Sequence, residues 1–271
     1  MPELPEVETV RRGIAPHIVG KTILELVLRA PSLRLPLDPA LCRILPGQAI
    51  RQVLRRAKYL LLMTDQGCLI IHLGMSGVLR TLPAGSTEHK HDHVDLMFTD
   101  GTCLRFTDPR RFGIFIYSCD DPLRHPLLAD LGPEPLDNHF QGELLYQRSR
   151  GKKQAVKTFI MDQKIVVGVG NIYANEVLFR SGIHPARAAG RISRQRYQRL
   201  AGAIKEVLLV AIAAGGTTIS DFFGSDGRPG YFRQELLVYG RGAQPCLVCG
   251  RTIRSCRLGQ RSTFLCSFCQ R

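Results

Sequence analysis

The sequence predicts an α+β protein with an N-terminal β-sandwich and flanking helices, then a helical domain, then a short C-terminal ribbon that carries four paired cysteines. Three observations lead to this prediction. Short apolar and β-branched runs separated by turn residues fill the first half of the chain, helical periods replace them from about Gly132, and two C-x-x-C pairs stand near the end. A length of 271 residues suits two main domains.

The first residues, MPELPE, predict a helix with a reactive amine in front of it. Pro5 is a favourable first helical residue, and the following EVETVRRGI carries acids early and arginines late. Removal of Met1 would leave Pro2 with a secondary amine whose pKa of about 8 keeps a useful fraction unprotonated. Such an amine can attack a sugar carbon and form an iminium. An ordinary capped surface helix is the alternative that these residues leave open.

The expected strands are short runs bounded by turn residues. They are TILELVL, AIRQVLRR, YLLLMT, CLIIHL, DLMFT, CLRFT and FGIFIYS. Asp100-Gly101 is the signal of a hairpin turn between two of them. Helical periods follow in EVLFRSGI and in RISRQRYQRLAGAIKEVLLVAIAA, and Gly215-Gly216 should end the second helix.

The two cysteine pairs predict a zinc ribbon hairpin. Cys246 and Cys249 form one C-x-x-C pair, and Cys266 and Cys269 form the other at the separation of a four-thiolate zinc site. Because four thiolates leave no open coordination position, we expect one structural Zn²⁺. Two disulfides are the disfavoured alternative in a chain that looks intracellular. The other cysteines are expected to be reduced core thiols; they are Cys42, Cys68, Cys103, Cys119 and Cys256.

The charge balance indicates a polyanionic partner. The chain has 37 Lys and Arg against 23 Asp and Glu, a formal charge of +14 and a pI near 9.7. Charge alone does not separate DNA from RNA or an anionic membrane. The first residues lack a basic-then-apolar signal pattern, and no apolar run is long enough to span a bilayer, so we expect a soluble protein of the cell interior with no membrane partner.

Motifs from both ends of the chain resemble those of the formamidopyrimidine-DNA glycosylase family. They are MPELPEVETVRRG, RRAKYLLL, HLGMSG, HDHVDL, TDPRRFG, LGPEPL, VVGVGNIYANE, GGTT, SDGRPGYF and QRSTFLCSFCQ. The resemblance implies a bifunctional DNA glycosylase and AP lyase of base excision repair. Such an enzyme excises 8-oxoguanine and formamidopyrimidines from duplex DNA by Schiff-base catalysis with β,δ-elimination. It also implies a bacterial cytoplasmic protein associated with the nucleoid, and we expect a monomer.

The resemblance also gives the domains their names and bounds. It implies a catalytic β-sandwich domain in 1–131, a helix-two-turn-helix DNA-binding domain in 132–240 and a zinc finger in 241–271. The glycine-rich stretch 217–239 would be a loop that caps the lesion. Leu4 stands where the Nei-type sister branch usually has glycine, which favours the oxidised-purine branch.

Four catalytic roles follow from the resemblance. Pro2 would attack C1′ of the damaged nucleoside, and Glu3 would protonate the sugar ring oxygen. Lys58 would donate a proton in β-elimination. Without the resemblance, a solvated lysine at a sheet edge is the ordinary interpretation of this residue. Arg261 would grip the phosphate beside the lesion and assist δ-elimination. Glu6 would order this site.

The resemblance further implies contacts to DNA. Met75 and Phe112 would enter the base stack and Arg110 would hydrogen-bond the orphaned cytosine, although a Met is more often a core residue. His89, His91 and His93 in HKHDHVDL alternate as on one face of a strand near the DNA, so we favour phosphate contact by His91 over a metal site. Phosphate contacts, or simply a solvated basic face, are expected at Lys152 and Lys157. Asn171, after the glycine-rich turn VVGVG, is expected to grip a DNA phosphate.

Two other functions stay open from the residues alone. A damage sensor would keep the basic surface and the ribbon without needing Pro2, Glu3 and Lys58 together. A Nei-type enzyme would act mainly on oxidised pyrimidines. One departure from the family pattern is Arg251, which occupies a ribbon position usually filled by a small or uncharged residue. There we expect an altered phosphate contact rather than lost folding.

Overall fold

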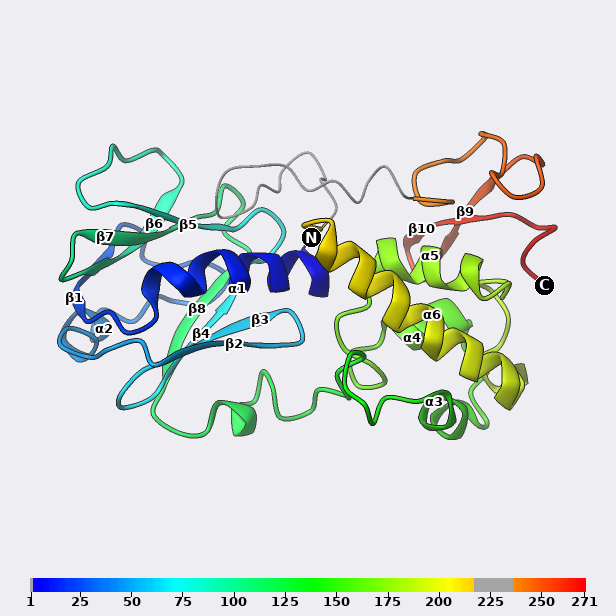
Figure 1. Ribbon diagram of the computed structural model, residues 1–271, viewed down its shortest axis with the longest axis horizontal. Helices are drawn as coiled ribbons and strands as arrows, with labels where there is room; N and C mark the ends of the chain where they lie inside the picture. The colour runs from blue at the N-terminus through cyan, green and yellow to red at the C-terminus, as the bar shows by residue number, and fades with distance from the viewer. Residues whose placement is uncertain (1, 217–235) are drawn as a thin grey trace. The chain divides into compact units, whose positions relative to one another are not determined.

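The computed structural model describes residues 2–216 and 236–271. The chain divides into two compact units. We call them the sheet unit, which holds the described residues up to Asp130 together with 214–216, and the helical unit, which holds the described residues of Leu131–Ala213 and Phe232–Arg271. Figure 1 shows both units.

The sheet unit contains two four-stranded antiparallel sheets. The first has the order β1 (Ile23–Leu28), β6 (Asp92–Phe98), β7 (Thr102–Thr107), β5 (Val78–Pro83). The second has the order β2 (Gln52–Arg56), β3 (Tyr59–Met63), β4 (Cys68–His72), β8 (Ile114–Ser118). Most consecutive strands are joined by short turns. The expected Asp100-Gly101 turn links β6 to β7, and Gly101 has a φ of 81°. The predicted β-sandwich is therefore confirmed.

Helix α1 (Leu4–Ile18) runs along both sheets, and it packs on β2 and β3 of one and on β5 and β7 of the other (Figure 1). Its buried apolar residues Val7, Val10, Ile14 and Ile18 recur at helical spacing and enter the core between the sheets. Each such side chain contributes roughly 1.5–3 kcal/mol by leaving water. This packing fixes the N-terminal end of α1 against the sheets. Two short helical segments complete the unit, α2 (Leu41–Ile44) and η1 (Pro122–Arg124).

Strand β5 was not predicted from the sequence. Its six residues are mostly half-buried, because β5 is an edge strand and packs on only one neighbour, β7. Pro83 ends it, as a proline can only at an edge. The weak apolar alternation of VLRTLP left no clear strand signal.

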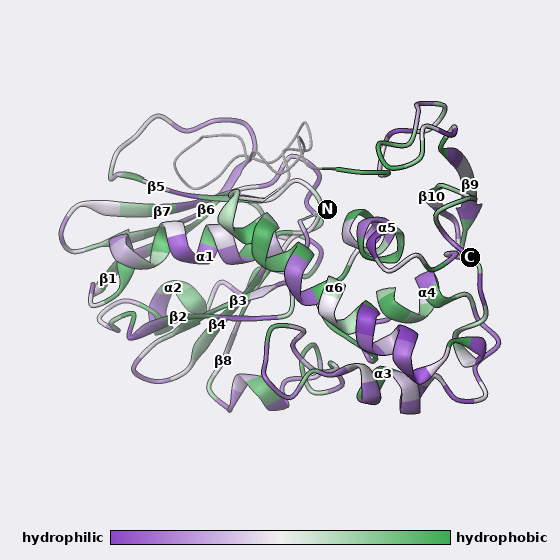
Figure 2. Ribbon diagram, turned by 45° about the vertical axis from the view of Figure 1, so that its right-hand side comes forward, coloured by the Kyte–Doolittle hydropathy of each residue, from purple (hydrophilic) through white to green (hydrophobic). Residues whose placement is uncertain are grey.

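The helical unit is built around α5 (Asn171–Arg180) and α6 (Arg194–Ala213), both near the expected positions. Hydrophobic and hydrophilic segments alternate along α6 in Figure 2, and its buried residues face α3 (Gly142–Ser149) and α5. Gly215 and Gly216 follow α6 with φ values of 75° and 83°, which confirms the predicted stop. The sequence analysis missed α3, the short α4 (Val156–Met161) and η2 (Ala189–Arg191).

The four-cysteine segment belongs to the helical unit and forms the predicted hairpin from β9 (Arg254–Leu258) and β10 (Arg261–Leu265). It is held to the helices of this unit. The Asn175 side chain accepts the Phe264 backbone N–H at 2.8 Å, and the buried Glu176 carboxylate accepts the N–H groups of residues 237, 238 and 239 at 2.8–3.0 Å. Helix α5 therefore organises both ends of the ribbon.

The remaining cysteines only partly match their expected burial. Cys68 and Cys103 are buried, and burial raises their thiol pKa values to about 12 and about 11. Cys42 is half-buried, but Cys119 and Cys256 are exposed, so the prediction of core thiols is wrong for these two. Cys119 follows the end of β8, and Cys256 lies in the exposed strand β9, where no second layer covers it. In residues 2–216 and 236–271, no helix is long and apolar enough to cross a membrane.

Candidate active site and zinc centre

The N-terminal residues form a buried cap on α1. Pro2 and Glu3 are both buried, and Glu3 is the N-cap residue in extended conformation ahead of Leu4 and Pro5. The Glu6 carboxylate accepts the Glu3 backbone N–H at 2.8 Å, which is one half of a capping box. This arrangement fixes the backbone that carries Pro2 and Glu3.

Lys58 occupies a tight turn rather than an exposed sheet edge. It follows Ala57 in the two-residue connection between β2 and β3, and only 6% of Lys58 is exposed. Ala57 has a φ of 54°, a left-handed conformation that costs a non-glycine residue roughly 1 kcal/mol. The reading of Lys58 as a solvated edge lysine therefore fails. The turn holds the amine inside the sheet unit.

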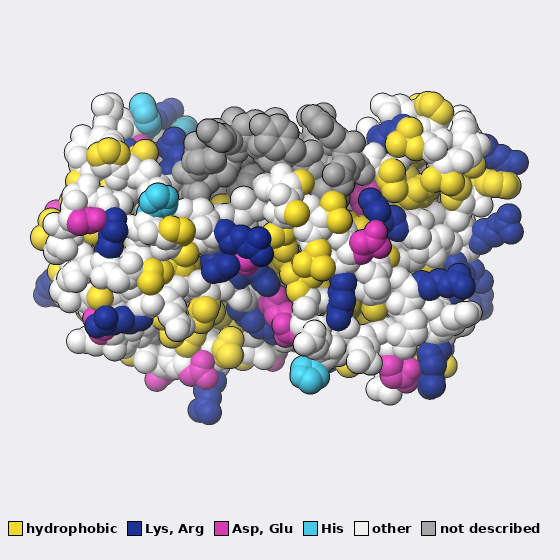
Figure 3. Space-filling view, in the orientation of Figure 1, with side chains coloured by type: hydrophobic (Ala, Val, Ile, Leu, Met, Phe, Trp, Pro, Cys, Tyr) yellow, Lys and Arg dark blue, Asp and Glu magenta, His cyan; other side chains and the backbone are white. Residues whose placement is uncertain are grey.

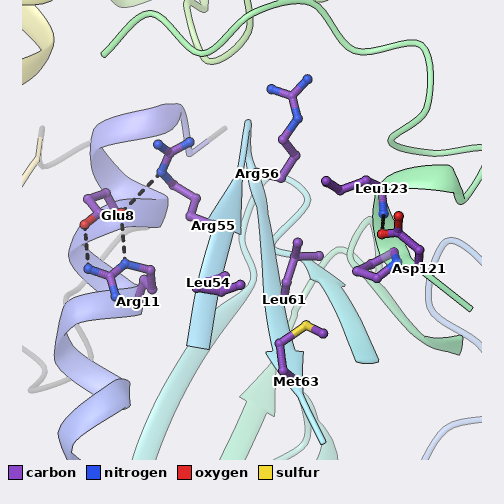
Figure 4. A pocket seen from close by; sticks show the side chains of 10 residues that line it. Glu8, Arg11, Leu54, Arg55, Arg56, Leu61, Met63, Asp121 and Leu123 are labelled. Atoms are coloured by element: carbon purple, nitrogen blue, oxygen red, sulfur yellow. Dashed lines mark hydrogen bonds and ion pairs between the residues drawn. The ribbon is translucent and has the colours of Figure 1, made fainter. Parts of the chain in front are cut away.

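Contacts between α1 and β2 set the position of that turn. Arg55 contacts the Glu8 carboxylate at 3.2 Å (Figure 4), and Arg11 donates to the Val53 carbonyl at 3.3 Å. The strand therefore advances toward the N-terminal end of α1. Its next residues are Ala57 and Lys58, so the Lys58 turn lies toward the end of the helix that begins with the buried Glu3.

An ionic cluster around the buried Glu8 stabilises this alignment. Glu8 pairs with Arg11 at 2.9 Å, with Arg12 at 2.8 Å and with Arg55. Burial alone would raise the pKa of Glu8, but the hydrogen bonds from Arg11 and Arg12 and the nearby positive charges lower it overall. Basic side chains gather over α1 in Figure 3. The cluster therefore stabilises the packing of the helix against β2, and the Glu8 carboxylate is already paired within it.

Beside this cluster lies a pocket of about 560 Å³ on the sheet unit (Figure 4). Its apolar wall comes from Leu54, Leu61 and Met63. None of the predicted site residues lines this pocket. This pocket is therefore not the predicted site.

His72 is a residue that the sequence analysis did not single out. It ends β4 opposite Tyr59, with the two rings 4.9 Å apart, and its Nδ1 accepts the Gly74 backbone N–H at 2.9 Å. Burial, together with the charges of Lys58 and Arg34, lowers its pKa to about 4. The structure thus brings a neutral imidazole into the field of Lys58. The position of His72 at the start of the motif HLGMSG was the sequence signal that could have identified it.

The three residues expected at the flipped base are exposed on two neighbouring loops. Met75 is 37% exposed and Phe112 is 44% exposed, so Met75 is not a core residue. Arg110 is exposed and its guanidinium carbon lies 4.8 Å from the centre of the Phe112 ring. The structure therefore brings together the two side chains expected to enter the base stack and the arginine expected to bond the orphaned cytosine. We call them the wedge residues.

The histidine prediction needs correction. Strand β6 begins at Asp92, so His89 and His91 precede it, and of the three only His93 lies in the strand. His93 is buried and its Nε2 donates to the Asp108 carbonyl at 2.9 Å. The three histidines therefore do not share an exposed face. The Asp92 and Asp95 carboxylates pair with the Arg105 guanidinium, and this pairing allows the polar segment to be buried. His91 remains half-exposed.

Lys152 and Lys157 have different environments. Lys152 is exposed, as a phosphate-binding or solvated lysine requires. Lys157 is fully buried in α4, and its Nζ donates to the Ser262 carbonyl at 2.8 Å and to Thr263 Oγ1 at 2.7 Å. The expectation of a solvated basic face is wrong for Lys157, because the hairpin covers it. Its ammonium group anchors β10 instead of facing solvent.

Asn171 and Arg261 stand at the ends of elements. Asn171 is the first residue of α5, and its side-chain Oδ1 is buried without a hydrogen-bond partner among the described residues. Arg261 is the first residue of β10 and is exposed at the hairpin tip, next to the Gly259-Gln260 turn. Both turn residues have positive φ values, 53° and 58°. The tip packs tightly on Thr158, so Arg261 projects from a fixed turn.

The four ribbon cysteines fit a zinc ion. Their sulfur atoms all lie within 4.8 Å of one another, with Cys249 and Cys266 3.4 Å apart and Cys246 and Cys269 4.0 Å apart. A tetrahedral Zn²⁺ with bonds of about 2.3 Å needs sulfur separations of about 3.8 Å. In the part of the chain that the structure describes, no other group of His, Cys, Asp or Glu could hold a metal. These cysteines form one structural zinc site.

Arg251 stacks on Phe268, within the second C-x-x-C pair. Its guanidinium carbon lies 3.8 Å from the centre of the Phe268 ring. Phe268 stands in the sequence between the ligands Cys266 and Cys269. The Arg251 carbonyl accepts the Cys246 N–H at 2.8 Å. The unusual arginine is therefore part of the ribbon's packing. The expected lesion-capping loop, residues 217–239, lies outside the described residues except for its last four positions.

Comparisons with known proteins agree along the whole chain. Residues 1–115 match the model of the formamidopyrimidine-DNA glycosylase N-terminal domain, 131–223 match its H2TH domain, and 243–271 match the zinc finger found in FPG and IleRS. A formamidopyrimidine-DNA glycosylase of Syntrophotalea carbinolica is 58% identical over 271 residues, with both chains fully covered.

Solved structures give the same result. The crystal structure of the MutM (Fpg) protein of Thermus thermophilus is 37% identical with a TM-score of 0.87, and the match covers 99% of this chain and 98% of that one. A complex between wild-type Lactococcus lactis Fpg and DNA containing N7-benzyl-Fapy-dG is 34% identical with a TM-score of 0.91 and covers 99% of each chain. The chain therefore belongs to the formamidopyrimidine-DNA glycosylase family, whose members are DNA glycosylases with AP lyase activity.

Proposed function

We propose that this enzyme excises oxidised purines from duplex DNA and then cleaves the strand, with the amine of Pro2 as the nucleophile. The observation that carries the proposal is the buried N-terminal cap, in which Pro2 and Glu3 precede α1 on a backbone fixed by Glu6. A surface helix would leave these residues exposed. A buried amine beside a buried carboxyl group suits covalent catalysis at a sugar carbon.

The reaction starts once Met1 has been removed. The Pro2 nitrogen attacks C1′ of the damaged nucleoside, the bond from C1′ to the base breaks, and Glu3 protonates the sugar ring oxygen as the ring opens. The resulting iminium acidifies the C2′ hydrogen. Loss of that proton expels the 3′ phosphate by β-elimination, and a second elimination expels the 5′ phosphate. Hydrolysis of the iminium then frees Pro2 and leaves a one-nucleoside gap.

Two cations assist the eliminations. Lys58 is held in the β2–β3 turn toward the Glu3 end of α1, where it can supply a proton during β-elimination. Arg261 projects from the hairpin tip and grips the phosphate that leaves in δ-elimination. The zinc ion takes no chemical part because its four thiolates fill the coordination sphere. It keeps the strand that begins with Arg261 folded.

The wedge residues supply access to the base. Flipping a nucleotide costs a few kcal/mol of stacking and pairing, and inserted Met75 and Phe112 side chains recover part of it. Arg110 hydrogen-bonds the orphaned cytosine. Phosphate contacts come from His91, Lys152 and Asn171. We no longer propose such a contact for the buried Lys157.

The partner is double-stranded DNA with an oxidised purine. The Lactococcus lactis relative was solved with lesion-containing DNA, and the formal charge of +14 suits a DNA ligand. We propose a monomer that works in the bacterial cytoplasm on the nucleoid. We keep the assignment of 1–131 as the catalytic domain, 132–240 as the helix-two-turn-helix domain with its lesion-capping loop and 241–271 as the zinc finger.

The experiment that tests the nucleophile is borohydride trapping on a duplex with 8-oxoguanine opposite cytosine, followed by peptide mapping of the crosslink. We expect the adduct on Pro2. A crosslink that maps to Lys58 would refute the nucleophile assignment. The same assay on a duplex with an oxidised pyrimidine measures the preference for purines, and faster excision of the pyrimidine would place the enzyme with the Nei-type branch.

A Glu3→Gln variant separates the two reactions. It keeps a side chain of similar shape but cannot donate the proton, so we expect base excision to fall by about 10²–10⁴-fold. Trapping on a preformed abasic site should remain, because the ring there opens without help. Glu25→Gln, an exposed change on β1, is the matched control and should leave both reactions intact. Equal losses of excision and of trapping would argue against the acid role of Glu3.

A further inference from the structure

We propose that Asp108 is a positioning residue whose buried carboxylate locks two loops into one rigid unit. These wedge loops are residues 73–77, which carry Met75, and residues 108–113, which carry Arg110 and Phe112. The proposal rests on the proposed function, because it takes Met75, Arg110 and Phe112 to be the residues that enter the duplex. Asp108 itself does not reach DNA, since it is fully buried behind these loops. It would act through the backbone that carries them.

The carboxylate of Asp108 accepts hydrogen bonds from both loops. Its Oδ1 accepts from Ser76 Oγ at 2.7 Å and from the Arg110 backbone N–H at 3.3 Å. Its Oδ2 accepts from the Gly113 backbone N–H at 2.7 Å. Ser76 follows Met75, and Gly113 follows Phe112. One ionised group therefore fixes the residue next to each apolar wedge residue, and bonds to a charged acceptor are the stronger kind.

The backbones of the two loops also touch. Gly74 has a φ of 63°, and a Cβ atom there would lie 2.5 Å from the Phe112 carbonyl carbon. A Cβ on Gly113 would lie 2.6 Å from the Phe106 ring and 3.1 Å from the Asp108 carboxylate. No side chain fits at either position. The glycines allow the close approach that lets one carboxylate serve both loops.

The backbone of Asp108 adds a third connection. Its N–H donates to the His91 carbonyl at 3.0 Å, and its carbonyl accepts from His93 Nε2 at 2.9 Å. The segment that carries the proposed phosphate contact His91 is thus tied to the same residue. Asp108 is the point at which three DNA-facing segments of the sheet unit meet.

Rigidity at this point has a physical purpose. A wedge displaces a base only if its own loop deforms less easily than the base stack, and extrusion costs a few kcal/mol. Met75 and Phe112 are 37% and 44% exposed, so side-chain packing holds them only in part. The resistance must come from the backbone beneath them. A buried carboxylate with three donors supplies it before DNA binds.

The test compares Asp108→Asn with wild type in single-turnover excision of 8-oxoguanine opposite cytosine. The amide keeps the shape but turns an NH₂ group toward one of the donors, so one connection is lost. We expect excision from a fully paired duplex to fall by about tenfold, the factor that one charge-assisted hydrogen bond represents. The loss should shrink to less than about threefold when mismatched pairs flank the lesion, because extrusion then costs less.

Three further measurements keep the outcome clear. Ser76→Ala removes the hydroxyl that donates to Asp108 and accepts the Arg110 N–H at 3.3 Å, but it keeps the Asp108 carboxylate and its bonds to the Arg110 and Gly113 N–H groups. It should show the same dependence on flanking pairs with a smaller loss. Asp65→Asn makes the same chemical change at a carboxylate that accepts from the Ala49 N–H and from Arg51 instead of from a wedge loop, and it should excise normally. Borohydride trapping on a single-stranded abasic site needs no extrusion, so Asp108→Asn should trap as wild type does.

The results separate the two proposals. If wild type forms no Pro2 adduct, the proposed function fails whatever Asp108 does. If trapping is normal but the Asp108→Asn defect has the same size on paired and mismatched duplexes, or is absent on both, the positioning role is wrong. If Asp108→Asn does not fold, Ser76→Ala decides the question by the same comparison of duplexes.

Discussion

The wedge loops and the zinc hairpin solve one problem in two ways. Each presents exposed side chains, for which we propose DNA contacts, from a short turn that has almost no core of its own. In the sheet unit the turn is fixed by the Asp108 carboxylate and by close backbone packing. In the helical unit it is fixed by four thiolates and the buried Lys157 ammonium group.

The difference follows from what surrounds each turn. The wedge loops join strands of two sheets with a shared apolar core, so a few hydrogen bonds suffice to set their final shape. The ribbon has a small core of buried residues that includes two of its own ligand cysteines. Such a segment cannot bury enough apolar surface to fold alone, so the metal supplies the missing free energy.

Metal removal should have the largest effect and should affect only one of the two regions. Structural zinc contributes about 10–16 kcal/mol to small zinc folds, so chelation should abolish hydrogen-exchange protection across β9 and β10. Amides of the wedge loops should keep their protection. Cys266→Ser should reproduce this pattern, and Cys256→Ser, an exposed non-ligand on β9, should bind zinc normally. A zinc-free protein with a protected hairpin would contradict the comparison.

Replacing Lys157 with Met should weaken the same hairpin without removing zinc. The change leaves the Ser262 carbonyl and the Thr263 hydroxyl without their buried donor, so we expect a loss of about 2–4 kcal/mol in the free energy of unfolding of the helical unit. Urea unfolding of the zinc-loaded protein measures it. Lys152→Met, the exposed counterpart, should change stability by less than about 0.5 kcal/mol. Equal midpoints for the two variants would show that Lys157 is not an anchor.

Lys157 also shows what the sequence could not reveal. Its partners lie about a hundred residues away, so nothing in GKKQAVK distinguishes it from the exposed Lys152. The buried carboxylates Asp92 and Asp95 were equally hidden, because their burial depends on the Arg105 guanidinium of the neighbouring strand. Local spacing predicted the zinc ligands, the α1 cap and the Asp100-Gly101 turn. Long-range pairing of polar groups leaves no local signal.

Acid should lower the stability of the sheet unit through His72, the residue directly before the loop that carries Met75. His72 has a pKa of about 4 when folded and about 6.5 when unfolded, so between these values only the unfolded chain takes up a proton. Stability should therefore be constant above pH 6.5, fall as the pH drops toward 4, and lose up to roughly 3 kcal/mol. Thermal unfolding across this range measures the loss.

The matched variant for this prediction is His72→Asn. Its side-chain oxygen can accept the Gly74 N–H but does not titrate, so the variant should lack the slope between pH 6.5 and 4. Carboxylates with lowered pKa values, such as Glu8 and Asp95, lose their contribution at lower pH and provide a common background. An unchanged slope in His72→Asn would assign the acid sensitivity to those carboxylates.

The smallest expected effect concerns Arg251, where packing and DNA contact can be separated. An exposed cation–π stack such as that of Arg251 on Phe268 contributes about 0.5–1 kcal/mol, so Arg251→Ser and Phe268→Leu should each lower ribbon stability by about that amount. Only Arg251→Ser removes a charge. If Arg251 also contacts a phosphate, it alone should reduce the slope of log K against log salt by about 0.9. Equal slopes for the two variants would reduce Arg251 to a packing residue, and the ribbon would then meet DNA through Arg261 and its other arginines.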